Sequence, residues 1–63
     1  MIEVNIVGDS ETIREMLDHF HATIVESFPS NHGERDINIH VEDGQVDDLI
    51  DWCDEHDLEC DVL

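Results

Sequence analysis

The chain contains no lysine and only two arginines, whereas aspartate and glutamate together account for 18 of its 63 residues. Its formal net charge is −16 at pH 7, well beyond the magnitude of roughly 2 to 8 that suits the solubility of a small domain. A charge of this size makes the folded chain repel itself. It also argues against direct binding to nucleic acid and to anionic membrane surfaces, because both are negatively charged.

Glycine, cysteine and long apolar runs are scarce as well. Each of these scarcities argues against one kind of protein or motif. The glycines Gly8, Gly33 and Gly44 each fall at an expected turn, so the chain has no phosphate-binding glycine motif. Two cysteines are too few for the disulfide framework of a secreted mini-protein. The N-terminal apolar run is short and contains Glu3, which is atypical of a signal peptide or a membrane span. We therefore expect a cytoplasmic protein with reduced thiols.

Catalysis is not expected from a chain of this length. A domain of about 60 residues buries only about 60% of the surface that its unfolded chain exposes, which leaves little room for a cleft. A catalytic carboxyl needs a pKa shifted by burial or by a neighbouring charge within such a cleft. We therefore predict that the protein is not an enzyme, has no catalytic residues and requires no cofactor.

Hydrophobic residues make up 40% of the chain and recur at regular spacing, which predicts one folded domain over residues 1–63 rather than a disordered acidic tail. Residues 2–7 alternate apolar and polar side chains, which predicts a strand. Asp9 or Ser10 can cap the helix that follows. The helix has a stripe of apolar residues at helical spacing: Ile13, Met16, Leu17 and Phe20.

The second half of the chain shows the same alternation of patterns. Residues 36–41 alternate as a strand, residues 42–44 form a turn, and a helix is predicted from Val46 to about His56. The apolar stripe of this helix consists of Val46, Leu49, Ile50 and Cys53. Residues 58–62 alternate as a final strand. A right-handed crossover would place the strands 36–41 and 58–62 parallel in one sheet.

Residues 22–28 allow two interpretations. Ile24 and Phe28 continue the helical spacing, whereas the β-branched Thr23, Ile24 and Val25 favour a strand. A strand gives the order βαββαβ, which resembles the ferredoxin-like fold, and we favour it over the three-stranded order βαβαβ. In both cases the fold class is α+β, with two helices on one face of a small sheet. The other face is left uncovered, which favours a homodimer because a domain this small gains stability by burying that face.

The densest acidic segment spans residues 42–61 and contains no lysine or arginine. Its ten carboxylates are predicted to bind a partner: Glu42, Asp43, Asp47, Asp48, Asp51, Asp54, Glu55, Asp57, Glu59 and Asp61. Five of them lie on one face of the second helix, where like charges four residues apart cost a few tenths of a kcal/mol each. At a rise of about 1.5 Å per residue these carboxylates recur roughly every 5 to 6 Å. This spacing is close to that of successive phosphates along a nucleic-acid strand, whose duplex carries one charge per about 1.7 Å of axis.

Trp52 lies beside this face and has two interpretations. It can be a lid that partly covers the hydrophobic core, or an aromatic anchor in an interface, where tryptophan is enriched among the residues that dominate binding. We include Trp52 in the predicted partner-binding surface.

Cys53, His56 and Cys60 suggest a zinc site, because Cys53 and His56 share a helix face and Cys60 follows four residues later. No fourth ligand has a matching spacing. Cys53 also continues the apolar stripe of the second helix, and Cys60 alternates with acids in the last strand. The pattern therefore favours packed thiols and no bound metal.

In size, charge and mixed α/β organisation the whole chain resembles the DNA-mimic inhibitors of phages and mobile elements, namely anti-CRISPR proteins, anti-restriction proteins and uracil-DNA glycosylase inhibitors. The resemblance is one of composition and involves no sequence motif. It implies that the acids of residues 42–61 occupy a cationic nucleic-acid channel on a basic protein or complex and exclude the nucleic acid. For a phage-encoded protein, the site of action would be the host-cell cytoplasm.

Adaptation to high salt is the alternative explanation of the charge, since lysine-free acidic chains are typical of salt-loving archaea. Under this hypothesis the chain is a small α/β protein of housekeeping or regulatory role, and its acids serve to hold water and cations. The chain departs from that composition in having seven isoleucines and a single alanine, Ala22. Both hypotheses remain open from the sequence.

Overall fold

The computed structural model describes all 63 residues as a four-stranded sheet with two α-helices. In chain order the elements are β1 (Ile2–Asp9), α1 (Ser10–Phe20), β2 (Thr23–Phe28), β3 (Glu34–Val41), a short 3-10 helix (Asp43–Gln45), α2 (Val46–Glu55) and β4 (Glu59–Val62). The strands lie in the order β2-β3-β1-β4, and each neighbouring pair is antiparallel. The predicted α+β, ferredoxin-like βαββαβ arrangement is thereby confirmed. The strands β3 and β4 run parallel to each other, as predicted, with β1 between them.

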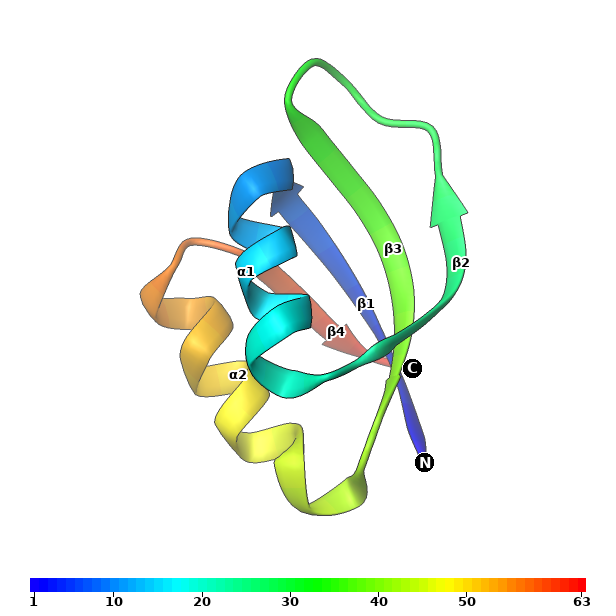
Figure 1. Cartoon of the computed structure of the whole chain (residues 1–63), viewed down its shortest axis with the longest axis vertical. Coiled ribbons are helices and arrows are strands. Elements are labelled where there is room, and N and C mark those ends of the chain that lie inside the picture. Colours follow the sequence, from blue (N-terminus) through cyan, green and yellow to red (C-terminus); the bar gives the residue numbers. More distant parts are fainter.

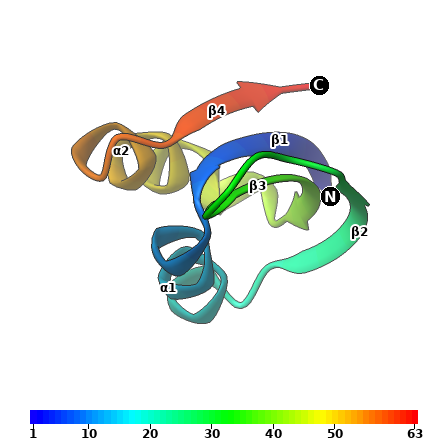
Figure 2. The same ribbon diagram turned by 90° about the horizontal axis from the view of Figure 1, so that it is seen from above.

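The core lies between the sheet and the two helices, which cover the same face of the sheet (Figures 1 and 2). Alternate residues of β1 and β3 point into it because side chains alternate across a strand. The helices supply the opposing layer through apolar residues at helical spacing. Eleven residues form this core: Val4, Ile6, Ile13, Met16, Phe20, Ile37, Ile39, Val41, Leu49, Cys53 and Leu58.

The helix α1 begins and ends at residues with definite local geometry. The carboxylate of Asp9 accepts hydrogen bonds from the backbone amides of Glu11 and Thr12, each at 3.1 Å, so Asp9 is the N-cap. At the other end His21 adopts a left-handed conformation with φ 52° and ψ 37°, which stops the helix.

Residues 23–28 form the strand β2, so the strand interpretation of this segment is correct. All six residues of β2 are exposed, and β2 contacts the sheet only through β3. Ile24 lies opposite Ile39, and a bulge follows between Ile24 and Glu26. The helical spacing of Ile24 and Phe28 was misleading, since both side chains lie outside the core.

One residue of the predicted apolar stripe of α2 is exposed rather than packed in or against the core. Ile50 is 40% exposed, whereas Leu49 and Cys53 are completely buried. Consecutive helical residues are about 100° apart, so Ile50 is turned away from Leu49 to the flank of the helix. That flank lies beside the short edge strand β4, beyond which the sheet has no further strand to cover the side chain.

Neither helix is long and apolar enough to cross a membrane.

Candidate partner-binding surface

The outer side of α2 carries five carboxylates that we call the α2 acidic face: Asp47, Asp48, Asp51, Asp54 and Glu55. All five are exposed, and none takes part in an ion pair or a side-chain hydrogen bond within the chain. The two ion pairs of the protein lie elsewhere. The N-terminal amine is 3.6 Å from Asp43 Oδ1, and His40 Nε2 is 3.6 Å from Glu3 Oε1.

Only some of the acids of α2 lie where they stabilise the helix. Asp47 and Asp48 lie in the first turn, where the positive end of the helix dipole favours negative charge. Asp54 and Glu55 lie in the last turn, which has no basic residue, and there a negative charge is unfavourable by a few tenths of a kcal/mol. The placement predicted from the sequence is therefore one that helix stability does not explain.

Ile50 borders a hollow of about 240 Å³ on the β4 side of α2. The hollow combines an apolar floor with two carboxylates and is lined by Ile50, Asp51, Cys53, Asp54, Leu58 and Cys60. Sequence reasoning missed this hollow because Ile50 continues the apolar stripe. The acids that surround Ile50 at positions 47, 51 and 54 were the available signal that it lies at the edge of the stripe.

Trp52 lies on the other flank of α2, next to α1. Its ring stacks on that of His56 at a centroid distance of 3.7 Å and an angle of 12°. It also meets Phe20 edge-on at 6.3 Å and lies 6.1 Å from His19. Trp52 is half-buried and packs against the core, which fits the lid interpretation. A contribution of its remaining exposed edge to partner binding stays a prediction.

The other predicted acids do not all lie on the side of α2. Glu42 and Asp43 precede the helix, and Asp57 follows it with φ 58°. Glu59 and Asp61 lie on β4 opposite Val7 and Asn5 of β1, and Asp61 and Asn5 line the same hollow on the uncovered face of the sheet. The ten acids are thus divided between two faces, eight around α2 and two on the far side of the sheet.

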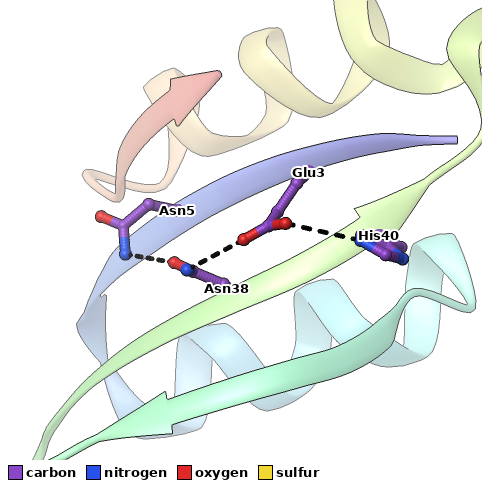
Figure 3. Close-up of polar contacts among 4 residues, drawn as sticks. All are labelled: Glu3, Asn5, Asn38 and His40. Atoms are coloured by element: carbon purple, nitrogen blue, oxygen red, sulfur yellow. Dashed lines mark hydrogen bonds and ion pairs between the residues drawn. The ribbon is translucent and has the colours of Figure 1, made fainter. Parts of the chain in front are cut away.

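The uncovered face also carries a hydrogen-bonded row of polar side chains (Figure 3). Asn5 Nδ2 donates to Asp36 Oδ1 at 2.7 Å and to Asn38 Oδ1 at 2.8 Å. Asn38 Nδ2 in turn donates to Glu3 Oε2 at 3.1 Å, and the other oxygen of Glu3 faces His40. Sequence reasoning did not identify this row, because the pairing of residue 5 with residue 38 depends on the register of β1 and β3.

Two copies of the uncovered face would repel each other. Several carboxylates lie on it according to the sheet register, among them Glu3, Glu26, Asp36, Glu59 and Asp61. Burial of like charges without counter-ions is costly. The face-to-face homodimer suggested by an uncovered sheet is therefore disfavoured by the charge of that sheet.

Cys53 and Cys60 are free thiols next to each other in the fold. Burial, with a contribution from Cys60, raises the pKa of Cys53 to about 12, and burial likewise raises the pKa of Cys60. His56 faces a different partner, since its Nδ1 lies 2.8 Å from the carbonyl oxygen of Trp52. No group of three or more His, Cys, Asp or Glu side chains is arranged to hold a metal ion.

Comparisons of the chain with protein-family models, with curated proteins and with solved structures found no match in any of the three. The chemistry available to the protein is therefore inferred from its own surface, which offers unpaired carboxylates on a helix, an apolar hollow beside them and a buried core behind them.

Proposed function

We propose that the protein is a nucleic-acid mimic that uses the α2 acidic face to bind the cationic nucleic-acid channel of a defence complex, of CRISPR or restriction type, or of another DNA-processing complex. Bound there, it would inhibit the complex by excluding nucleic acid. The observation that carries the proposal is that five exposed carboxylates on one helix have no cationic partner in the chain.

The rigidity of α2 supports this function. A helix holds side chains at i and i+4 about 6 Å apart along its axis, so Asp47, Asp51 and Glu55 present a regular row of negative charge. Lysine and arginine side chains that normally contact phosphates can pair with such a row by charge-assisted hydrogen bonds. Repulsion within the free protein is relieved when the partner supplies the missing positive charge.

The hollow beside Ile50 adds an apolar contact to the charged face. Lysine and arginine carry long apolar stems below their charged heads. A stem can lie across Ile50 while its head reaches Asp51 or Asp54, which line the same hollow. An apolar centre with a charged rim is the usual composition of a protein–protein interface.

The test is displacement of a labelled DNA duplex from a panel of purified CRISPR effector complexes and restriction enzymes at 0.15 M salt. We expect inhibition of at least one, with an affinity that falls steeply as salt is added. The triple variant Asp47→Asn, Asp51→Asn, Asp54→Asn should bind more than tenfold more weakly and keep its circular-dichroism spectrum, because it removes repulsion within α2.

A matched control is available on α1. The triple variant Glu11→Gln, Glu15→Gln, Asp18→Asn changes the net charge equally at exposed positions and should inhibit almost as well as the unmodified protein. Equal losses for both triple variants would show that only net charge matters. A panel in which no complex releases its DNA would remove the proposal.

The salt dependence of folding separates this function from adaptation to high salt. A mimic acting at moderate ionic strength must be folded there, whereas a halophilic protein unfolds in dilute buffer and folds in molar salt. We expect the far-ultraviolet circular dichroism at 0.1 M NaCl to equal that at 2 M NaCl. Unfolding at 0.1 M would favour salt adaptation.

A further inference from the structure

Charge is distributed unequally between the two halves of the chain. Residues 10–35, which include α1 and β2, hold both arginines and five of the carboxylates. Residues 36–63, which include α2 and β4, hold eleven carboxylates and no lysine or arginine. Between His19 and Gly33 the only acid is Glu26. The strand β2 and its flanking turns are therefore the least charged part of the surface.

The same strand is an edge of the sheet with exposed apolar side chains. β2 pairs only with β3, so its outer backbone groups have no strand beside them. Ile24, Val25 and Phe28 are exposed by 40%, 43% and 38%. Apart from the bulge between Ile24 and Glu26 and the charge of Glu26, β2 has none of the features that keep an edge strand from pairing with another strand. The opposite edge strand, β4, is shorter and carries Glu59 and Asp61.

We infer that two copies of the chain associate through their β2 edges, antiparallel about a two-fold axis, and so join their sheets into one continuous sheet. A two-fold interface must be complementary to itself, and the nearly neutral β2 edge is the one edge that meets a copy of itself without strong repulsion. The inference does not depend on the proposed inhibitory function.

The sheet order explains why such a dimer tolerates the charge of the protein. α2 and β4 lie at the side of the sheet away from β2 (Figure 2), so pairing through β2 places the two α2 acidic faces at the far ends of the dimer. The chain measures 32 × 23 × 18 Å, whereas charges are screened over about 8 Å at physiological ionic strength. The distant faces therefore contribute little repulsion. A small domain also gains stability when a partner covers exposed apolar side chains.

The test is sedimentation equilibrium of the full chain from 10 μM to 1 mM, at 0.1 M and 1 M NaCl. We expect a monomer–dimer equilibrium whose dissociation constant falls at least threefold at 1 M NaCl, because salt screens the residual repulsion. This salt dependence is opposite to that expected for inhibition of a cationic complex, so the two proposals succeed or fail separately. A chain that remains monomeric at 1 mM and 1 M NaCl would overturn the inference.

A matched pair of variants locates the interface. Val25→Asp on β2 should weaken the dimer at least tenfold, whereas Val62→Asp on β4, which is 50% exposed, makes the same chemical change at the other edge and should leave it intact. Loss of the dimer in Val62→Asp with its retention in Val25→Asp would contradict the β2 interface.

Amide hydrogen exchange of the unmodified protein provides a measurement that needs no variant. At 1 mM the amides of residues 23–28 should exchange more slowly than at 10 μM, and those of residues 59–62 should not change. Slowing confined to β4, or to the residues of the uncovered sheet face, would contradict the inference even if the protein is dimeric.

Discussion

The two edge strands of the sheet, β2 and β4, differ in length, in charge and in exposed apolar side chains. The strand β2 is six residues long, has one acid and exposes three large apolar side chains, whereas β4 has four residues, two acids and the α2 acidic face beside it. The difference divides the protein into a strongly acidic side around α2 and β4 and a nearly neutral side at β2, and each of the two proposals concerns one of these sides.

The largest expected effect is on the free energy of unfolding, and it tests whether α1 and α2 pack into one hydrophobic core. Ile13 of α1 and Leu49 of α2 are both completely buried, so Ile13→Ala and Leu49→Ala should each lower the free energy of unfolding by about 2–5 kcal/mol. Ile50→Ala should cost less than about 1 kcal/mol, because that side chain is partly exposed. Urea denaturation followed by tryptophan fluorescence measures all three. A cost for Ile50→Ala equal to that of Leu49→Ala would place Ile50 in the core.

An intermediate effect is expected at alkaline pH, and it arises from the buried thiol of Cys53 on α2. Burial raises the pKa of Cys53 from 9.0 to about 12, so the folded state keeps a proton that the unfolded state loses. The stability contributed by this thiol is complete below pH 9 and is lost as the pH rises towards 12. At pH 10.5 the loss should be on the order of 1–2 kcal/mol relative to pH 8.

The composition makes this alkaline measurement unusually direct. The chain has no lysine and no tyrosine, so the two thiols are the main side chains that titrate between pH 8 and 11. Urea denaturation of Cys53→Ala provides the control, since this variant should lose most of the pH dependence. If the free energy of unfolding of Cys53→Ala depends on pH as strongly as that of the unmodified protein, the effect belongs to another group.

The smallest expected effect compares the ends of the two helices. His21 after α1 and Asp57 after α2 both have positive φ, 52° and 58°, a conformation that glycine adopts without strain. Asp57→Gly should raise the stability by about 1 kcal/mol, because it relieves strain and removes a negative charge near a helix C-terminus. His21→Gly should raise it by less, since only strain is relieved. Thermal denaturation compares them, and a larger gain at His21 would mean that the charge at Asp57 is not unfavourable.

The candidate site was predictable from the sequence where it depends on a single helix. The five acids of the α2 acidic face have a spacing that places them together in any helix spanning residues 46–55. Their exposure agrees with that prediction. Glu59 and Asp61 were grouped with them because they are close in sequence, whereas the pairing of β4 with β1 turns both residues to the uncovered face.

The sequence by itself determined the charge of the protein, the limits of most helices and strands, and the apolar residues of β1 and β3, because these depend on local composition and on periodicity along the chain. Only the tertiary structure decided that residues 23–28 form an exposed edge strand, that Ile50 lies outside the core, and that the acids fall on two faces. These features depend on which elements lie beside one another in the sheet. Whether a side chain at these positions is buried depends on neighbours that are distant in sequence. The pattern of residues within one segment therefore cannot predict it.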